Sequence, residues 1–179
     1  MMKPSPLQLN WITYPQASFE ALPSFDGDPS IPVTPRIEAT VQYFLDGQHS
    51  ASLEIRNSEN APGPYKFHVG VVTSFSFDLE SAQSAYSTKK GGALSSVIGV
   101  NICRILYASA RELLSNFTAR APHQSLTLAS LIIEPSDVTF ESKDDPFLVL
   151  KEVFSASDDE ISSIEKAVKG TKGKPKRKA

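Results

Sequence analysis

The longest amphipathic pattern in this chain covers residues 99–120. Apolar or small side chains recur there at intervals of three and four residues, which places them on one face of an α-helix. Each large apolar side chain buried on such a face contributes roughly 1.5–3 kcal/mol. The pattern therefore predicts one long helix that is the main packing element of the chain. Its apolar face comprises Ile102, Ile105, Leu106, Ser109, Ala110, Leu113 and Phe117.

Apolar and polar residues alternate in four segments before this helix, which predicts β-strands. The segments are residues 7–14, 36–45, 50–56 and 65–77. Asp46-Gly47 joins the second to the third, and glycine suits a tight hairpin turn because it adopts positive φ. We therefore expect the α+β class: a four-stranded antiparallel sheet with a long helix and shorter C-terminal helices packed on one face.

Five prolines fall between residues 15 and 35. Proline has no backbone donor, so we expect a loop here rather than a helix or a central strand. Phe19, Leu22, Phe25 and Ile31 are interleaved with the prolines. Such a loop either covers the core or offers an apolar surface to a partner, and at this point both readings stand.

The C-terminal part of the chain contains an extended arm, then helical patterns, then a basic segment. Short helical patterns are expected over residues 147–154 and 161–168, after an extended arm over 125–133. Residues 170–179 carry five basic residues and no acidic one, and this composition predicts disorder. We therefore expect one domain, residues 1–169, followed by a basic tail. The total charge is −2, so the domain itself is acidic.

The residue types that usually perform catalysis or bind metals form no recognisable motif. Cys103 is the only cysteine, which excludes a disulfide framework, and its place on the helix predicts a buried thiol. The three histidines lack metal-ligand spacing, and no phosphate-binding loop is present. We therefore expect no catalytic site, no metal and no cofactor. With no long apolar run and no signal peptide in the sequence, we expect a cytoplasmic protein.

Two stretches resemble the SecB export chaperones. The first is Ser18-Phe19-Glu20-Ala21-Leu22-Pro23, which follows the first strand. The second is Ile105-Leu106-Tyr107-Ala108-Ser109-Ala110-Arg111-Glu112, with Arg120 near the helix end and Leu126-Thr127-Leu128 in the arm. The similarity covers residues 7–133 in the same order as the predicted elements.

The resemblance implies an ATP-independent chaperone that holds unfolded or pre-secretory polypeptides in apolar grooves. It also implies a homotetramer, assembled as a dimer of dimers through edge strands and long helices. The implied groove residues are Phe19, Leu22, Phe25, Val33, Phe75 and Phe77. The implied subunit contacts are Ile102, Ile105, Ser109, Leu113 and Phe117.

One partner implied by the family fits this sequence poorly. Secretion-dedicated members dock the motor SecA through acidic residues on the sheet and first loop. Glu20 keeps one of these acids, whereas Gln16 and Gly70 replace two others. These replacements argue against SecA as a partner.

Two alternative functions remain open. A SecB-like protein outside secretion would hold one dedicated partner, such as an antitoxin. A nucleic-acid-associated protein would use the basic residues between Lys172 and Lys178 to contact phosphates. The acidic domain argues against the second function.

Overall fold

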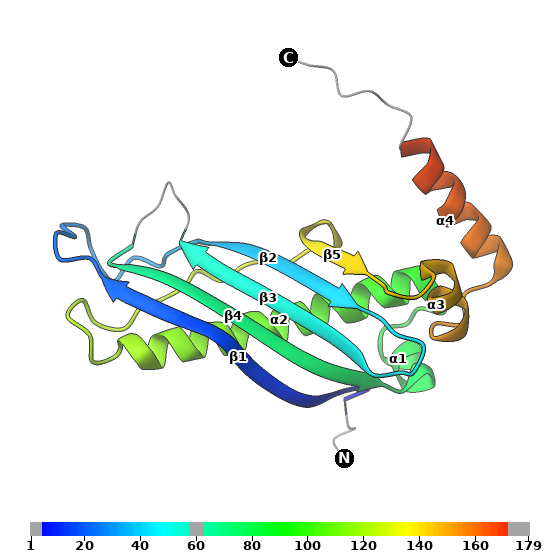
Figure 1. Cartoon of the computed structure of the whole chain (residues 1–179), viewed down its shortest axis with the longest axis horizontal. Coiled ribbons are helices and arrows are strands. Elements are labelled where there is room, and N and C mark those ends of the chain that lie inside the picture. Colours follow the sequence, from blue (N-terminus) through cyan, green and yellow to red (C-terminus); the bar gives the residue numbers. More distant parts are fainter. Residues whose placement is uncertain (1–4, 58–62, 172–179) are drawn as a thin grey trace.

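The computed structural model describes residues 5–57 and 63–171, with side chains described up to residue 166. Figure 1 shows a twisted sheet with one long helix running across one of its faces. The elements in chain order are β1 (Leu7–Ala21), β2 (Pro35–Gln42), β3 (His49–Asn57), β4 (Tyr65–Phe77), α1 (Leu79–Ala85), α2 (Gly91–Thr118), the 3-10 turn η1 (Pro135–Asp137), β5 (Val138–Glu141), α3 (Pro146–Glu152) and α4 (Asp158–Thr171).

The sheet has five strands in the order β1-β4-β3-β2-β5, so the α+β class is confirmed and the strand number is corrected. The first four strands pair antiparallel, as expected. The fifth strand, β5, pairs parallel with β2, so that Val41 lies opposite Phe140. A strand of four residues has too few positions to show alternation, and this is why the sequence pattern did not predict it.

The first strand is longer than predicted. β1 continues through Pro15 to Ala21, a segment that the prolines had marked as loop. β1 lies at the edge of the sheet, where a proline removes no ladder hydrogen bond that the sheet requires. The pairing with β4 shifts register between Thr13 and Gln16, on either side of the proline. As a result Phe19 lies in a strand, opposite Phe67.

The core lies between the sheet and α2. Alternate residues of β2, β3 and β4 point towards the helix, and Val41, Leu53 and Val71 have no exposed area. On the helix, Ile98, Ile102, Leu106, Ala110 and Leu114 are equally buried. α2 is long and apolar enough to cross a membrane, but half of that stretch is buried inside the domain, as in the core helix of a globular fold.

The long helix begins earlier than the pattern predicted. It starts at Gly91 with Lys90 as the N-cap, eight residues before Gly99. Within this added stretch the hydroxyls of Ser95 and Ser96 donate to the carbonyl of Gly92, one turn back along the helix. Ser and Thr make this bond inside helices.

The segment after α2 runs along the sheet before the chain reaches the last two helices. The arm bonds to the loop between β1 and β2: the Val33 N–H donates to the Thr127 carbonyl and the Ala129 N–H donates to the Val33 carbonyl. Helices α3 and α4 confirm the two short helical patterns. α4 continues to Thr171, past the predicted domain end at residue 169. Most of the predicted basic tail, residues 172–179, lies outside the described residues.

Candidate binding surface

The helix-facing side of β1 is only partly covered. α2 crosses the sheet over β3 and β4, and β1 lies beyond it. Leu9 and Phe19 are 37% and 40% exposed, whereas their partners on β4, Phe75 and Phe67, are 0% and 3% exposed. On this face of the sheet the side chains of β1 are therefore much more exposed than those of its neighbour β4. The helix-facing side chains of β1 form a partly exposed apolar strip.

One flank of α2 adds exposed apolar side chains beside this strip. Ile105 and Phe117 are exposed, and Leu113 between them is half-buried. The Phe117 ring stacks on that of Phe19, with centroids 5.8 Å apart and an interplanar angle of 26°. The strand and the helix flank therefore meet at this pair. We call the whole feature the β1–α2 surface; it comprises Leu9, Ile12, Phe19, Ile105, Leu113 and Phe117.

The loop between β1 and β2, called the crossover loop below, is held against one end of this surface. Nε2 of His123 lies 2.9 Å from the Leu22 carbonyl, and the Phe25 ring packs edge-on against the His123 ring. The loop encloses a hollow of about 250 Å³ whose walls include Phe25, Val33 and Ile31. Val33 is buried and Ile31 is 63% exposed. The loop therefore does both things that its sequence allowed: it covers part of the core and offers apolar surface.

The structure does not bring the six predicted groove residues together. Phe19, Leu22, Phe25 and Val33 lie at the crossover-loop end, whereas Phe75 and Phe77 lie at the other end of β4. Phe77 lies ten positions along β4 from Phe67, the partner of Phe19, which corresponds to about 33 Å. Phe75 is fully buried, and Phe77 stacks on Phe154 at 5.3 Å. The binding surface proposed below therefore omits Phe75 and Phe77.

The predicted subunit contacts divide into two groups. Ile102 is fully buried against the sheet of its own chain, so it offers nothing to a second copy. Ile105, Ser109, Leu113 and Phe117 lie on the flank of α2 and are exposed or half-buried. Contact of these four residues with a second copy stays a prediction.

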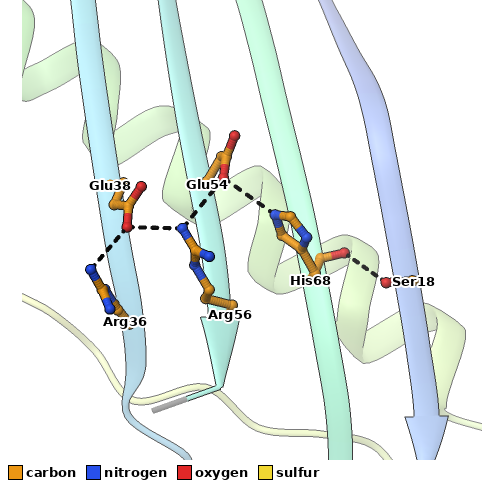
Figure 2. Close-up of polar contacts among 6 residues, drawn as sticks. All are labelled: Ser18, Arg36, Glu38, Glu54, Arg56 and His68. Atoms are coloured by element: carbon orange, nitrogen blue, oxygen red, sulfur yellow. Dashed lines mark hydrogen bonds and ion pairs between the residues drawn. The ribbon is translucent and has the colours of Figure 1, made fainter. Parts of the chain in front are cut away.

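The opposite face of the sheet is mostly polar, and its charges pair with one another. Figure 2 shows a chain of contacts that crosses β2, β3 and β4. The nitrogen–oxygen distances are 3.2 Å for Arg36–Glu38, 2.8 Å for Arg56–Glu38, 3.8 Å for Arg56–Glu54 and 3.3 Å for His68–Glu54. All five side chains are partly exposed, so each pair contributes at most about 1 kcal/mol. The network makes this face a polar surface whose charged side chains are paired, unlike the β1–α2 surface on the other face of the sheet.

The three positions that correspond to the SecA-docking acids also lie on this polar face. Gln16 pairs with Gly70 across β1 and β4, and Glu20 pairs with Lys66. Two of the positions thus lack a carboxylate, and the third faces a lysine. The poor fit of SecA as a partner stays a prediction from the sequence.

The buried thiol and the buried imidazole are both poorly suited to reaction. Burial raises the pKa of Cys103 to about 12, so the thiol stays protonated near neutral pH. Burial lowers the pKa of His49 to about 4, against a weaker opposing effect of Asp46. Within residues 5–57 and 63–171 no three metal-ligating side chains gather into a site. That the chain is not an enzyme stays a prediction.

Comparison with known proteins gives distant similarities of fold. No family model matches the sequence, and no curated protein matches it. The fold is similar to a SecB-like chaperone, Rv1957 of Mycobacterium tuberculosis, solved in complex with a ChAD peptide from the HigA1 antitoxin. The identity is 14%, 71% of this chain and 88% of that chain are covered, and the TM-score is 0.45. A Streptococcus agalactiae protein of unknown function is similar at 11% identity, with 70% and 97% covered and a TM-score of 0.39. At such TM-scores neither similarity decides family or function.

Proposed function

We propose that this protein is an ATP-independent chaperone that holds unfolded polypeptides on the β1–α2 surface. The observation that carries the proposal is the stacked pair of Phe19 and Phe117. Both residues are more than a third exposed, at the point where a partly covered strand meets an exposed helix flank. Exposed aromatic residues gathered in this way mark an interaction site rather than ordinary surface.

An extended chain has two ways to bind this surface. Its apolar side chains lose contact with water against Phe19 and Phe117, and its backbone pairs with the part of the free β1 edge beside Phe19. Neither interaction reads a particular sequence. Binding is therefore expected to be broad, and it requires no nucleotide.

The assembly that we propose uses part of the same surface. β1 is a 15-residue edge strand, and an edge of this length readily pairs with a second chain. Pairing of two β1 strands, with contacts through Ile105, Ser109 and Leu113, gives a dimer, and two such dimers give a homotetramer. The crossover-loop end, with Phe19, stays open for the client. We propose that the protein acts in the cytoplasm and without SecA.

The proposal is tested by light scattering of heat-aggregating citrate synthase in the absence of nucleotide. We expect the wild-type chain to suppress aggregation and Phe19→Asp to lose most of this effect. Thr13→Asp is the matched control, because it places a carboxylate on the polar face of the same strand. Circular dichroism establishes that both variants are folded.

Two results would count against this function. Suppression by folded Phe19→Asp equal to that of the wild type would show that the β1–α2 surface is not the binding site. A wild-type chain that suppresses nothing but binds one peptide tightly would indicate a dedicated partner chaperone instead.

A further inference from the structure

The crossover loop is bonded at its start to the turn that follows α2. Figure 1 shows the loop and this turn at the same end of the sheet, where β1 ends. The Leu22 carbonyl lies 3.2 Å from the Phe25 nitrogen and 2.9 Å from Nε2 of His123. Because a carbonyl oxygen only accepts hydrogen bonds, Nε2 carries a proton and donates it here. The His123 side chain therefore supplies the second donor to this carbonyl.

The turn that carries His123 has an unfavourable backbone conformation. The next residue, Gln124, has a φ of +67°, in the left-handed region that residues with a Cβ atom seldom adopt. Tyr65, which is fully buried, holds the turn: its hydroxyl donates to the Gln124 carbonyl at 2.7 Å and accepts from the His123 N–H at 3.1 Å. Such conformations persist only where the surrounding structure imposes them, and they cluster at functional sites. The core thus fixes the position of His123.

The His123 ring also belongs to a series of five aromatic rings that runs from the crossover loop to α2. Its centroid lies 6.0 Å from that of Phe25 and 5.7 Å from that of Tyr65, edge-on in both cases. The Tyr65 centroid lies 6.5 Å from that of Phe19, which stacks on Phe117. The series connects the loop to the pair of rings that carries the proposed function.

A histidine meets both requirements of this position. A phenylalanine ring could pack between Phe25 and Tyr65, but it would leave the Leu22 carbonyl without its second donor. A glutamine places its own Nε2 the same number of bonds from Cα, so it keeps the donor and loses the ring. The hydrogen bond and the ring contacts can therefore be removed one at a time.

We propose that His123 is a positioning residue for polypeptide binding. Its bond to Leu22 holds the crossover loop against the domain, so that Phe25 and the exposed Ile31 extend the β1–α2 surface beyond Phe19. A bound polypeptide then gains apolar contacts along the loop as well as at Phe19. Without the bond the loop leaves this position and the added contacts are lost. The position of the loop follows from the contacts of this chain alone, whereas its role in binding rests on the proposed function.

Two variants of the full chain test the proposal. His123→Phe keeps a ring and removes the donor, whereas His123→Gln restores the donor. Hydrogen exchange measured by mass spectrometry should be at least tenfold faster in His123→Phe for the amides of residues 24–34. The amides of residues 50–56, in the core strand β3, should change less than twofold, which shows that the variant is folded and the effect is local.

Binding is measured on the same variants by fluorescence anisotropy. The probe is labelled, reduced and carboxymethylated α-lactalbumin, a permanently unfolded protein. We expect the dissociation constant of His123→Phe to be at least fivefold higher than that of the wild type. His123→Gln should recover both the loop exchange and the dissociation constant to within twofold of the wild type, because the donor is restored.

The possible failures can be told apart. Loop exchange in His123→Phe within twofold of the wild type overturns the role of the hydrogen bond in holding the loop. Faster loop exchange with unchanged binding overturns the role of the loop, and His123→Gln that binds as weakly as His123→Phe overturns the role of the donor. If α-lactalbumin binds to no form of the chain, the proposed function fails, and loop exchange still decides whether His123 holds the loop.

Discussion

Phe19 and Phe117 come from distant parts of the sequence, yet their rings stack 5.8 Å apart. The resemblance to SecB implied different roles for them: Phe19 in the polypeptide groove and Phe117 in the contact between subunits. Their contact joins the two predicted surfaces into one continuous apolar surface. Under the proposed function the client and the second copy occupy neighbouring parts of it, so changes at one part are expected to affect the other.

The two faces of α2 should differ strongly in their effect on stability. Leu106 is fully buried against the sheet, whereas its neighbour Ile105 is 36% exposed on the flank. Leu106→Ala leaves a cavity in the core and should lower the free energy of unfolding by about 2–5 kcal/mol. Ile105→Ala should lower it by less than about 1 kcal/mol in the separated subunit. Urea denaturation of both variants at low protein concentration measures the difference. Equal losses would mean that the helix is rotated relative to the arrangement described above.

His49 should make stability depend on pH. Its ring is buried, its Nδ1 accepts the Phe44 N–H at 3.2 Å, and burial lowers its pKa to about 4 from an ordinary 6.5. Between these values the unfolded chain binds a proton that the folded chain does not, so stability falls as pH falls from about 6.5 to 4. The loss attributable to His49 is at most about 3 kcal/mol, and above pH 6.5 His49 contributes no slope.

Replacing His49 isolates this effect. In His49→Gln, the slope of the unfolding free energy against pH should be shallower between pH 6.5 and 4 and unchanged between pH 7 and 8. Urea denaturation at a series of pH values gives both slopes. Identical slopes in the wild type and the variant below pH 6.5 would show that His49 takes up its proton equally well in the folded chain.

The mass of the protein in solution tests the proposed assembly. Light scattering after gel filtration should give four times the 19.5 kDa of one chain. Leu113→Asp places a charge on the α2 flank and should give a smaller species. Ala108→Asp is the control, since Ala108 lines a hollow on the arm side of α2, beside Leu126 and Leu128. A wild-type mass of 19.5 kDa would contradict the assembly, as would equal effects of the two variants.

The elements predicted correctly are those whose residues alone specify a buried face. β2, β3 and β4 each bury alternate residues under α2, so their period is visible in the sequence. β5 could not be predicted in this way, because its place depends on pairing with the distant Val41. The extension of β1 past Pro15 depends on its position at the sheet edge, which the local sequence does not state.

The candidate site was predictable in its residue types but only partly in its layout. The sequence indicated that Phe19 and Phe77 are available aromatic residues, but strand direction places them at opposite ends of the β1–β4 pair. It also placed Ile102 and Ile105 on one apolar stripe. Which of them faces the sheet depends on the rotation of the helix, and this is set by packing rather than by spacing.

The central claim, that unfolded chains bind at Phe19, is tested most directly by photo-crosslinking. Two variants carry p-benzoylphenylalanine, one in place of Phe19 and one in place of Thr13 on the polar face of the same strand. Each is irradiated with reduced, carboxymethylated α-lactalbumin. Our account predicts a strong crosslink from residue 19 and less than a tenth of that yield from residue 13. Equal yields from the two positions, or no crosslink from residue 19, would contradict it.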